Sequence, residues 1–252
     1  MESVMDRQKL LSWCDERLRV NAYKDYAPNG LQVEGRCDIN TIVLAVTASQ
    51  AAIDHAIQVG ADMLLVHHGL FWKSEPVPII GWKKQRIAAL LAHDINMVGF
   101  HLPLDAHETL GNNAQLARVC GWTVEAQVGD QGLIMLGKTE SANSLTEFLD
   151  QLETSLKRKP LGIGRPDKII NKLAWCTGGA QGYFQTAIDL GVDAFITGEV
   201  SEAQYHLAQE CDVAFISAGH HATERYGVQA LGEEISRTFG ITCQFFDEQN
   251  PV

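Results

Sequence analysis

The sequence predicts an α/β protein that contains two copies of one strand–helix unit. Apolar runs rich in β-branched residues alternate with segments of helical periodicity, which is typical of sheets covered by helices on both faces. The order of these elements repeats later in the chain, which indicates an internal duplication. Histidines follow several of the apolar runs, and the ends of such strands are where open α/β sheets bind their ligands.

The first half of the chain supplies most of the expected elements. Leu10, Leu11, Cys14 and Leu18 have helical spacing and predict a helix over residues 5–19, and the Pro-Asn-Gly sequence that ends at residue 30 predicts a turn. The next elements are expected at 41–46 (strand), 49–59 (helix), 63–66 (strand), 83–92 (helix), 96–100 (strand) and 111–120 (helix).

The middle of the chain has a different character. Residues 133–137 are expected to form a strand, and residues 144–156 form an amphipathic pattern. Residues 160–166 are rich in glycine and proline, which is typical of a connection. This region is therefore a candidate boundary between two lobes.

A repeat relates the two halves of the chain. Residues 43–68 read as strand, turn, helix, Gly-Ala-Asp and strand, and residues 173–199 give the same order with Gly-Val-Asp. Ala56 and Ala187 precede these glycines at the same distance, so one constant offset relates the two copies. Only two copies are visible, which indicates a duplication and not a solenoid.

Composition and charge exclude several classes of protein. Hydrophobic residues make up 46% of the chain, which is too many for a disordered protein. The net charge of −11 argues against direct nucleic-acid binding, because phosphate backbones attract a basic face. No apolar run reaches the roughly 18 residues of a membrane span, and the N-terminus has acids where a signal peptide needs basic residues. We therefore expect a cytoplasmic protein that does not bind membranes, with reduced cysteines because no C-x-x-C pair occurs.

Three short stretches hold most of the histidines, and each begins where an apolar run ends. Acidic residues accompany two of these stretches. Imidazoles and carboxylates suit divalent first-row cations, whereas a thiolate site is absent. The stretches are His67-His68, His101 with Asp105 and His107, and His220-His221 with Glu224.

The spacing of these residues favours a pair of metal ions. His67 and His68 are expected to point to opposite sides of a strand, so each suits a different ion of a pair roughly 3.5 to 4 Å apart. His220 and Glu224 share a face if a helix begins there, and Glu224 has two oxygens to bridge two ions. Two divalent ions carry four positive charges against two carboxylates, which favours an activated water, the nucleophile of a hydrolase. For a single histidine, the alternative is an ordinary hydrogen-bonding residue at a strand end.

Two further residues are candidates for substrate binding. Trp72 follows the strand that ends in histidines and has the geometry to stack a planar substrate, although packing is the alternative role. Lys83 lies in the only dense basic stretch, 82–86, and suits a phosphate, with the solvated start of a helix as the alternative. In the second copy, Glu199 and its neighbours replace His67-His68, so that copy is expected to lack a metal pair of its own.

Five sequence blocks, taken in order, resemble a known family. From about residue 25 to the C-terminus, the chain resembles the Nif-three-like proteins, known in bacteria as GTP cyclohydrolase type two homologues. It is most similar to the short bacterial branch without a large inserted domain. The blocks are DYAPNGLQVEG (25–35), VHHG (66–69), HLPLD with GNN (101–105 and 111–113), TGE (197–199) and HHATE (220–224).

The resemblance implies two similar, interlinked α/β domains (α+β in some schemes) with mostly mixed sheets. We place a first lobe, which carries the metal ligands, at residues 1–124 with 211–252, and a second lobe at residues 125–210. The resemblance also implies two divalent ions per subunit (Zn, Mn, Fe or Mg) and a homohexameric ring with the sites facing its interior. Carried onto this sequence, the metal ligands are His67, His68, Asp105, His220 and Glu224, with His101 beside the metals.

We consider three functions. The first is a metal-dependent hydrolase of a nucleotide-like or other small substrate; by the family's label it opens the purine ring of GTP, with His101 as the candidate general base. The alternative is a non-enzymatic, metal-binding regulatory or scaffold protein whose ring engages partners, in line with the family's links to DNA damage responses and transcription. The third is an oxidoreductase that uses iron at the same site.

Overall fold

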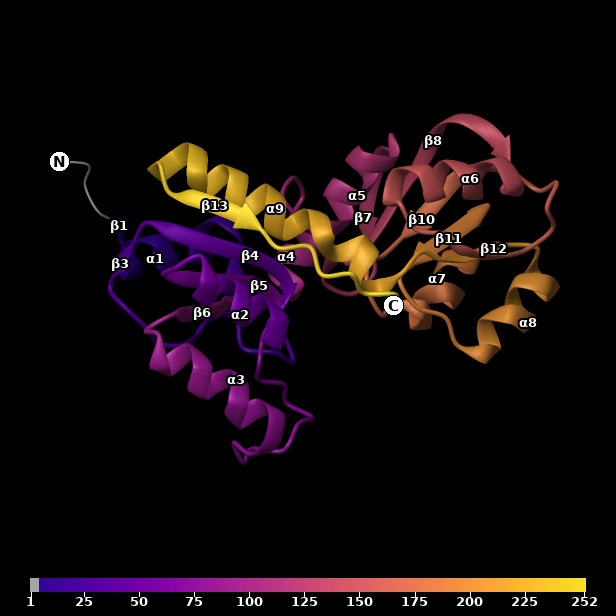
Figure 1. Cartoon of the computed structure of the whole chain (residues 1–252). Helices are drawn as coiled ribbons and strands as arrows, with labels where there is room; N and C mark the ends of the chain where they lie inside the picture. Colours follow the sequence, from indigo (N-terminus) through magenta and orange to yellow (C-terminus); the bar gives the residue numbers. More distant parts are fainter. Residues whose placement is uncertain (1–4) are drawn as a thin grey trace. The chain divides into compact units, whose positions relative to one another are not determined.

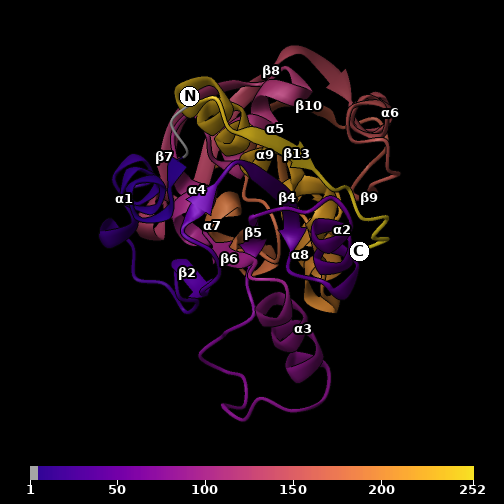
Figure 2. The ribbon, with the colours of Figure 1, turned by 60° about the vertical axis from the view of Figure 1, so that its left-hand side comes forward.

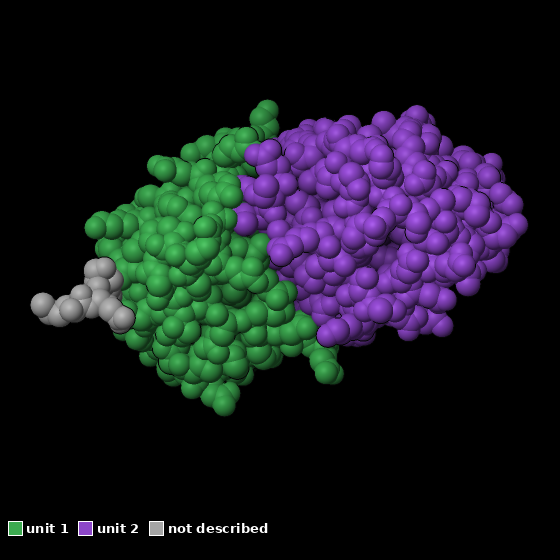
Figure 3. Space-filling view, turned by 90° about the horizontal axis from the view of Figure 1, so that it is seen from above, with its two compact units in different colours: residues 1–104, 227–249 green, residues 105–226, 250–252 purple. Residues whose placement is uncertain are grey.

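The computed structural model describes residues 5–252, which form two compact units (Figure 3). Unit 1 comprises Met1–Leu104 and Gly227–Gln249, and unit 2 comprises Asp105–Tyr226 and Asn250–Val252. The chain leaves unit 1, forms unit 2 and returns to unit 1, which confirms two interlinked α/β domains. The predicted boundaries after residues 124 and 210 stay a prediction. Residues 1–4, part of the stretch in which we expect no signal peptide, lie outside the described residues.

A five-stranded sheet forms the centre of unit 1 (Figure 1). Four of its strands are parallel and the fifth, β2, is antiparallel, so the sheet is mixed as expected. The strands β4 and β5 are nearly continuous apolar runs because side chains on both faces of the sheet are buried. In spatial order the strands are β13 (Thr242–Phe245), β4 (Thr41–Thr47), β5 (Met63–His68), β6 (Asn96–Gly99) and β2 (Gly30–Val33).

Helices cover both faces of the unit 1 sheet (Figures 1 and 2). On one face, Ile53 and Leu90 share a buried core with Leu64 of β5, and on the other Gly232 of α9 lies against Leu44. Besides a small antiparallel pair of β1 (Met5–Asp6) and β3 (Asp38–Ile39), the remaining elements are α1 (Arg7–Arg17), η1 (Val20–Ala22), α2 (Gln50–Gln58), α3 (Gly81–Ala92), α4 (Leu102–Ala106) and α9 (His220–Phe239).

Unit 2 is built on a six-stranded mixed sheet in which the neighbouring pairs β10–β11 and β11–β12 are parallel and the other three pairs are antiparallel. Residues 160–166, expected as a plain connection, contain the edge strand β9, so that expectation is wrong. Pairing of β9 with β12 supplies the backbone hydrogen bonds, which the glycine- and proline-rich composition does not reveal. The order is β7 (Thr123–Val128), β8 (Ile134–Ser144), β10 (Ile169–Trp175), β11 (Ala194–Thr197), β12 (Ala214–Ser217) and β9 (Leu161–Ile163).

Aromatic residues pack on both faces of the unit 2 sheet. Phe148 of α6 shares a core with Trp175 of β10, while Phe184 contacts Phe195 and Phe215, with ring centroids 6.1 and 4.9 Å away. A capping box between residues 144 and 147 begins α6 where the amphipathic pattern predicts a helix. The other elements are α5 (Asn112–Cys120), η2 (Asp130–Gly132), α6 (Leu145–Leu156), η3 (Gln181–Tyr183), α7 (Phe184–Asp189) and α8 (Glu202–Cys211).

The internal duplication is visible in strand order and register. The series β4-β5-β6-β2 of unit 1 corresponds to β10-β11-β12-β9 of unit 2, with the antiparallel strand at the same edge. Ile42 pairs with Met63, and Leu173 pairs with Ala194. The second pair lies at the positions that the sequence offset between the two copies assigns to the first pair. Strands β4 and β5 of unit 1 and strands β10 and β11 of unit 2 therefore pair in the same register.

An aspartate, buried in the first copy and half-buried in the second, repeats at this offset and holds the preceding strand. Asp62 Oδ2 accepts hydrogen bonds from the backbone N–H groups of residues 40 and 41, at 2.8 and 3.0 Å. Asp193 Oδ2 accepts the corresponding bonds from residues 171 and 172, at 3.0 and 2.7 Å. The Gly-X-Asp sequence recognised in both copies thus has the same structural role in each.

Two expectations from composition concern the membrane and the cysteines. Within residues 5–252, no helix is both long and apolar enough to cross a bilayer. The six cysteines are free thiols, as the absence of paired motifs predicts. Burial raises the pKa of the Cys14 and Cys120 thiols, the second to about 12, so they stay protonated at neutral pH.

We predict that Asp62→Ala lowers the free energy of unfolding by about 2 to 3 kcal/mol, because two backbone N–H groups lose their acceptor. Urea denaturation followed by circular dichroism measures this loss. Asp54→Ala is the control, since Asp54 is exposed on α2 and bonds only the nearby Gln50 in the contacts described here; its effect should stay within about 0.5 kcal/mol. Equal effects of the two substitutions would contradict the role given to Asp62.

Candidate metal centre

Three imidazoles meet at the carboxyl ends of β5 and β6 in unit 1. His67 and His68 end β5, and His101 follows β6, to which β5 is paired in parallel. The ring centroid of His67 lies 4.5 Å from that of His68 and 5.1 Å from that of His101. One potential ligand nitrogen from each of the three lies within 4.8 Å of the others. Such a group of imidazole nitrogens is a plausible binding site for a divalent first-row cation.

The expectation that His67 and His68 point to opposite sides of the strand is wrong. Their rings are neighbours, with an interplanar angle of 44°. Side-chain alternation holds within a regular strand, but β5 ends at His68 and the chain continues into the loop at Gly69. Both rings therefore reach the same cluster.

Each of the three clustered imidazoles is held through its Nδ1 atom by a different group. His67 Nδ1 lies 2.9 Å from the carbonyl oxygen of Phe100, and His68 Nδ1 lies 3.2 Å from Thr47 Oγ1. Because a carbonyl oxygen only accepts, Nδ1 of His67 carries the proton and Nε2 carries the lone pair. This tautomer, fixed by a second group behind the ring, is the one that metal-binding histidines use.

A carboxylate holds the third imidazole. Asp25 Oδ1 lies 2.9 Å from Nδ1 of His101, and both side chains are largely buried. Burial acts to raise the pKa of Asp25, but the hydrogen bond and charge of His101, together with Asn29 and Ala27, outweigh it and hold the pKa well below its usual range. Asp25 is therefore an ionised carboxylate at neutral pH.

Trp72 and Tyr26 border the imidazole cluster. The ring centroid of Trp72 lies 5.8 Å from His68 and 5.1 Å from His101, and the Tyr26 ring lies 4.9 Å from His101. Trp72 is thus at the position where a stacking residue was predicted, and its role in substrate binding stays a prediction. Lys83 is buried, with its ammonium 3.0 Å from Glu75, so it would have to give up this ion pair to bind a phosphate.

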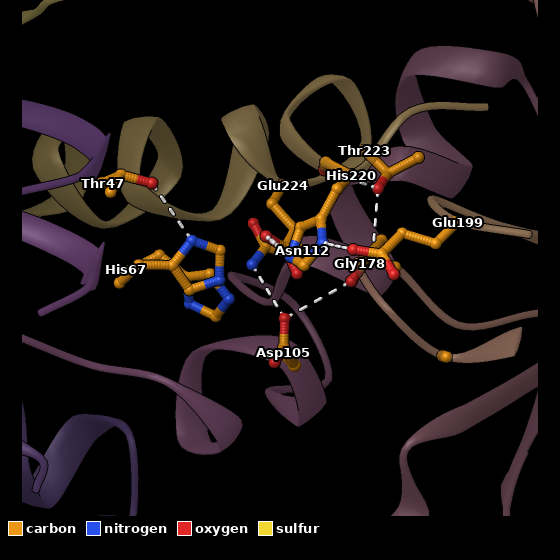
Figure 4. A network of polar contacts seen from close by, with 12 residues as sticks. Thr47, His67, Asp105, Asn112, Gly178, Glu199, His220, Thr223 and Glu224 are labelled. Carbon is orange, nitrogen blue, oxygen red and sulfur yellow. Dashed lines mark hydrogen bonds and ion pairs between the residues drawn. The ribbon is translucent and has the colours of Figure 1, made fainter. Parts of the chain in front are cut away.

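Unit 2 contributes a buried acid, Asp105, at its first residue. Asp105 Oδ1 accepts hydrogen bonds from Asn112 Nδ2 at 2.9 Å and from Thr177 Oγ1 at 3.3 Å (Figure 4). Cys176 is next to this group; burial raises the pKa of its thiol well above the usual value, and the charges of Asp105 and Glu224 raise it further. The thiol is therefore protonated, which leaves the carboxylate as the group that suits a hard cation.

His220 and Glu224 form the second cluster of unit 2. Helix α9 begins at His220, so the two residues lie one turn apart on one face as predicted, and His220 Nε2 is 3.1 Å from Glu224 Oε2. On the other side of the ring, Nδ1 lies 2.7 Å from Glu199 Oε1 (Figure 4). Burial acts to lower the pKa of His220, but its bonds to Glu224 and Glu199 and their charges raise it to about 9.

Gly178 packs closely against this cluster. Its φ angle is +69°, in the left-handed region, and a Cβ atom at this position would collide with Glu224 Oε1. The Gly178 N–H donates to Thr223 Oγ1 at 3.1 Å, and this hydroxyl donates to the carbonyl oxygen of His220 at 2.9 Å. Glycine at 178 therefore leaves room for the Glu224 carboxylate.

Several residues that orient the predicted ligands were not assigned a role from the sequence. In the sequence, Glu199 indicates only that the second copy lacks a metal pair of its own, whereas in the structure it holds His220. Asp25 and Asn112 lie in the sequence blocks that carry the family resemblance, and this position is the one feature of the sequence that points to a role for them in the site. Their partners lie 76 and 7 residues away along the chain, and spacing alone does not reveal the longer contact.

Comparisons with known proteins give one family. The Duf34/NIF3 family (NGG1p interacting factor 3) matches residues 5–251. A Neisseria meningitidis serogroup A protein named GTP cyclohydrolase 1 type 2 homolog is 60% identical over 246 residues, covering 98% of this chain and 99% of that protein. The Escherichia coli K12 protein of the same name is 47% identical over 249 residues, covering 98% and 100%.

Two solved structures are similar along nearly the whole chain. Protein ybgI, described as of unknown function, has a TM-score of 0.95 and 47% identity, covering 98% of this chain and 100% of that one. TTHA1606 from Thermus thermophilus has a TM-score of 0.88 and 34% identity, with the same coverage. The fold and its two mixed sheets are thus shared with these proteins.

We predict that His220 makes the stability of the metal-free protein depend on pH. Its pKa is raised from 6.5 to about 9 in the folded state, so its contribution is complete below about pH 6.5 and is lost as the pH rises through 9. One pKa unit corresponds to about 1.4 kcal/mol, and screening of this partly exposed ring reduces the total to about 2 kcal/mol. Urea denaturation of chelator-treated protein at pH values on both sides of this window measures the loss. The same slope in His220→Gln would contradict the assignment.

We also predict that Gly178→Ala destabilises the protein by about 3 kcal/mol, through the left-handed φ angle and the displaced Glu224 carboxylate. Gly191→Ala in the same unit is the matched control: its φ is +62°, but nothing lies within 4 Å of the added Cβ. The control should therefore cost only about 1 kcal/mol. Denaturant unfolding compares the two variants, and equal losses would show that contact with Glu224 is unimportant.

Proposed function

The chain belongs to the Duf34/NIF3 family, and we propose that it binds two divalent metal ions and uses them to hydrolyse a nucleotide-like or other small substrate. The proposed ligands are His67 and His68 from unit 1, and Asp105, His220 and Glu224 from unit 2. GTP is the first candidate substrate, because the similar proteins from Neisseria meningitidis and Escherichia coli are named GTP cyclohydrolase 1 type 2 homologs.

One observation carries the proposal: every imidazole of the two clusters is held at Nδ1 by another group. The groups are a carbonyl oxygen for His67, a hydroxyl for His68 and a carboxylate for each of His101 and His220. This arrangement makes Nε2 the candidate ligand atom of each ring, and Nε2 of His220, which is 3.1 Å from Glu224 Oε2, would exchange that contact for a metal ion. Contacts behind the ligand of this kind are typical of metal-binding histidines. The nitrogen and carboxylate donor set fits zinc, manganese or iron, and magnesium less well.

The bound metals would supply an activated water by lowering its pKa towards neutrality, and would stabilise negative charge on the substrate. The side chains of the chain provide binding and proton transfer. His101 lies beside the ligands, and its Nε2 atom is the candidate proton acceptor. Trp72 offers a flat surface next to His68 and His101, which suits a purine base. For GTP, the reaction would be hydrolytic opening at C8 of the purine, with that carbon released as formate.

We predict that elemental analysis of protein purified without chelators finds two divalent ions per chain. His68→Ala in unit 1 and Glu224→Ala in unit 2 should each lower this number or weaken binding about 10- to 100-fold. His206→Ala is the control, because His206 is exposed and pairs with Glu202 on α8. Full metal content in either ligand variant would exclude that residue from the centre.

We further predict that metal-loaded protein releases formate from GTP, and that His68→Ala or Glu224→Ala abolishes the release. If metal-replete protein leaves GTP unchanged over a long incubation, the GTP version of the proposal is wrong. Turnover of other nucleotides, esters or amides in a screen would still support the proposal that the protein is a hydrolase. No turnover of any substrate, together with partner binding that depends on the metal, would support the regulatory alternative. Native mass measurement tests the homohexameric ring in the same samples.

A further inference from the structure

We infer that Asp25 is a positioning residue that fixes the tautomer and orientation of His101, so that Nε2 of His101 is presented as an acceptor. The inference deepens the proposed function, because it defines what His101 offers to a substrate or water. The catalytic purpose of this tautomer rests on the proposed function. The hydrogen-bond network itself lies within unit 1 and does not depend on any substrate.

The Asp25 carboxylate is the centre of a small network of donors. Oδ1 accepts the backbone N–H of Ala27 at 3.1 Å and faces His101 Nδ1 at 2.9 Å. Oδ2 accepts Asn29 Nδ2 at 2.9 Å and the backbone N–H of Leu102 at 2.9 Å. Two contacts on each oxygen use the hydrogen-bonding capacity of an ionised carboxylate almost completely.

The protonation of this network follows from the groups that surround it. Asn29 Oδ1 accepts the backbone N–H of His101 at 2.7 Å, so the amide of Asn29 must present Nδ2 to Asp25. The N–H groups of Ala27 and Leu102 are donors by nature, which leaves no place for a proton on the carboxylate. His101 Nδ1 therefore carries a proton, and whenever the ring is neutral its lone pair lies on Nε2.

The orientation of the ring matters as much as the tautomer. Nε2 of His101, on the side of the ring opposite the nitrogen that faces Asp25, is 3.5 Å from the hydroxyl of Tyr26, which is half exposed. An Nε2–H tautomer would only donate at this place, whereas the tautomer set by Asp25 accepts a proton. A base in a hydrolytic reaction needs the second form, in which the carboxylate also stabilises the imidazolium that results.

A purely structural role for Asp25 is the competing explanation. Asp25 also holds the first backbone N–H of α4, and its carbonyl oxygen accepts from Lys73 Nζ, so a substitution disturbs the loop as well as the ring. Asn29 offers the comparison that separates the two effects. It accepts the backbone N–H of residue 101 and donates to Asp25 Oδ2, and among the hydrogen bonds described for residues 5–252 it makes none to the imidazole.

The test reads the tautomer directly from ring nitrogens. Metal-free protein labelled with ¹⁵N-histidine is studied by long-range ¹H–¹⁵N correlation at about pH 8.5, about two units above the ordinary imidazole pKa. The His101 signals are assigned by their loss in His101→Gln. We expect the wild type to show protonated Nδ1 and unprotonated Nε2. Asp25→Asn should lose this signature, because one amide oxygen replaces two carboxylate oxygens among four donors, whereas Asn29→Ala and the exposed control Asp54→Asn should keep it.

Two results would overturn the inference: an Nε2–H signature in the wild type, or an unchanged signature in Asp25→Asn. Loss of the signature in Asn29→Ala to the same extent as in Asp25→Asn would assign the effect to the loop and also overturn it. If Asp25→Asn fails to fold, the wild-type spectrum alone still decides the tautomer. This readout needs neither metal nor turnover. If the protein shows the tautomer but leaves GTP intact, GTP is excluded as the substrate and the role of Asp25 still stands.

Discussion

The parallel register of β4, β5 and β6 is the constraint on which the imidazole cluster of unit 1 depends. Thr47 of β4 is opposite His68 of β5, and Val66 of β5 is opposite Gly99 of β6, so three strands end at one edge of the sheet. A shift of one residue in either pairing would exchange the side chains that pack on the two covered faces of the sheet, and the packing on each face opposes this exchange. The histidines gain their common position from this packing and need no attraction to one another.

Packing brings the rings together, but hydrogen bonds at Nδ1 give them their chemistry. A free imidazole can place its proton on either nitrogen and can turn about its side-chain bonds. In unit 1 a carbonyl and a carboxylate fix the tautomers of His67 and His101, and a hydroxyl holds the orientation of His68. In unit 2, Glu199 and Glu224 hold the two nitrogens of His220. The residues that hold the rings at Nδ1 therefore define the site as much as the histidines do.

Local patterns allowed the fold to be predicted in large part, because strands such as β4 are continuous apolar runs and helices such as α6 have both a cap and a period. The expectation that His220 and Glu224 share a face depended on a helix that begins there, and α9 does begin at His220. Strand β9 was missed because its hydrogen bonds come from β12, which follows only after β10, α7, β11 and α8, and composition does not report such pairing. Asp25 and Glu199 were missed as orienting groups for a similar reason, since their importance lies in contacts with distant residues.

The constant offset between the two copies, which carries Ala56 onto Ala187, also carries His68 onto Glu199. One ancestral position has thus diverged into an imidazole in the first copy and an orienting carboxylate in the second. The two halves therefore supply different groups at the same point of one architecture: the first an imidazole, the second the carboxylate that holds His220. A chain built from two copies of either half would lack one of these groups.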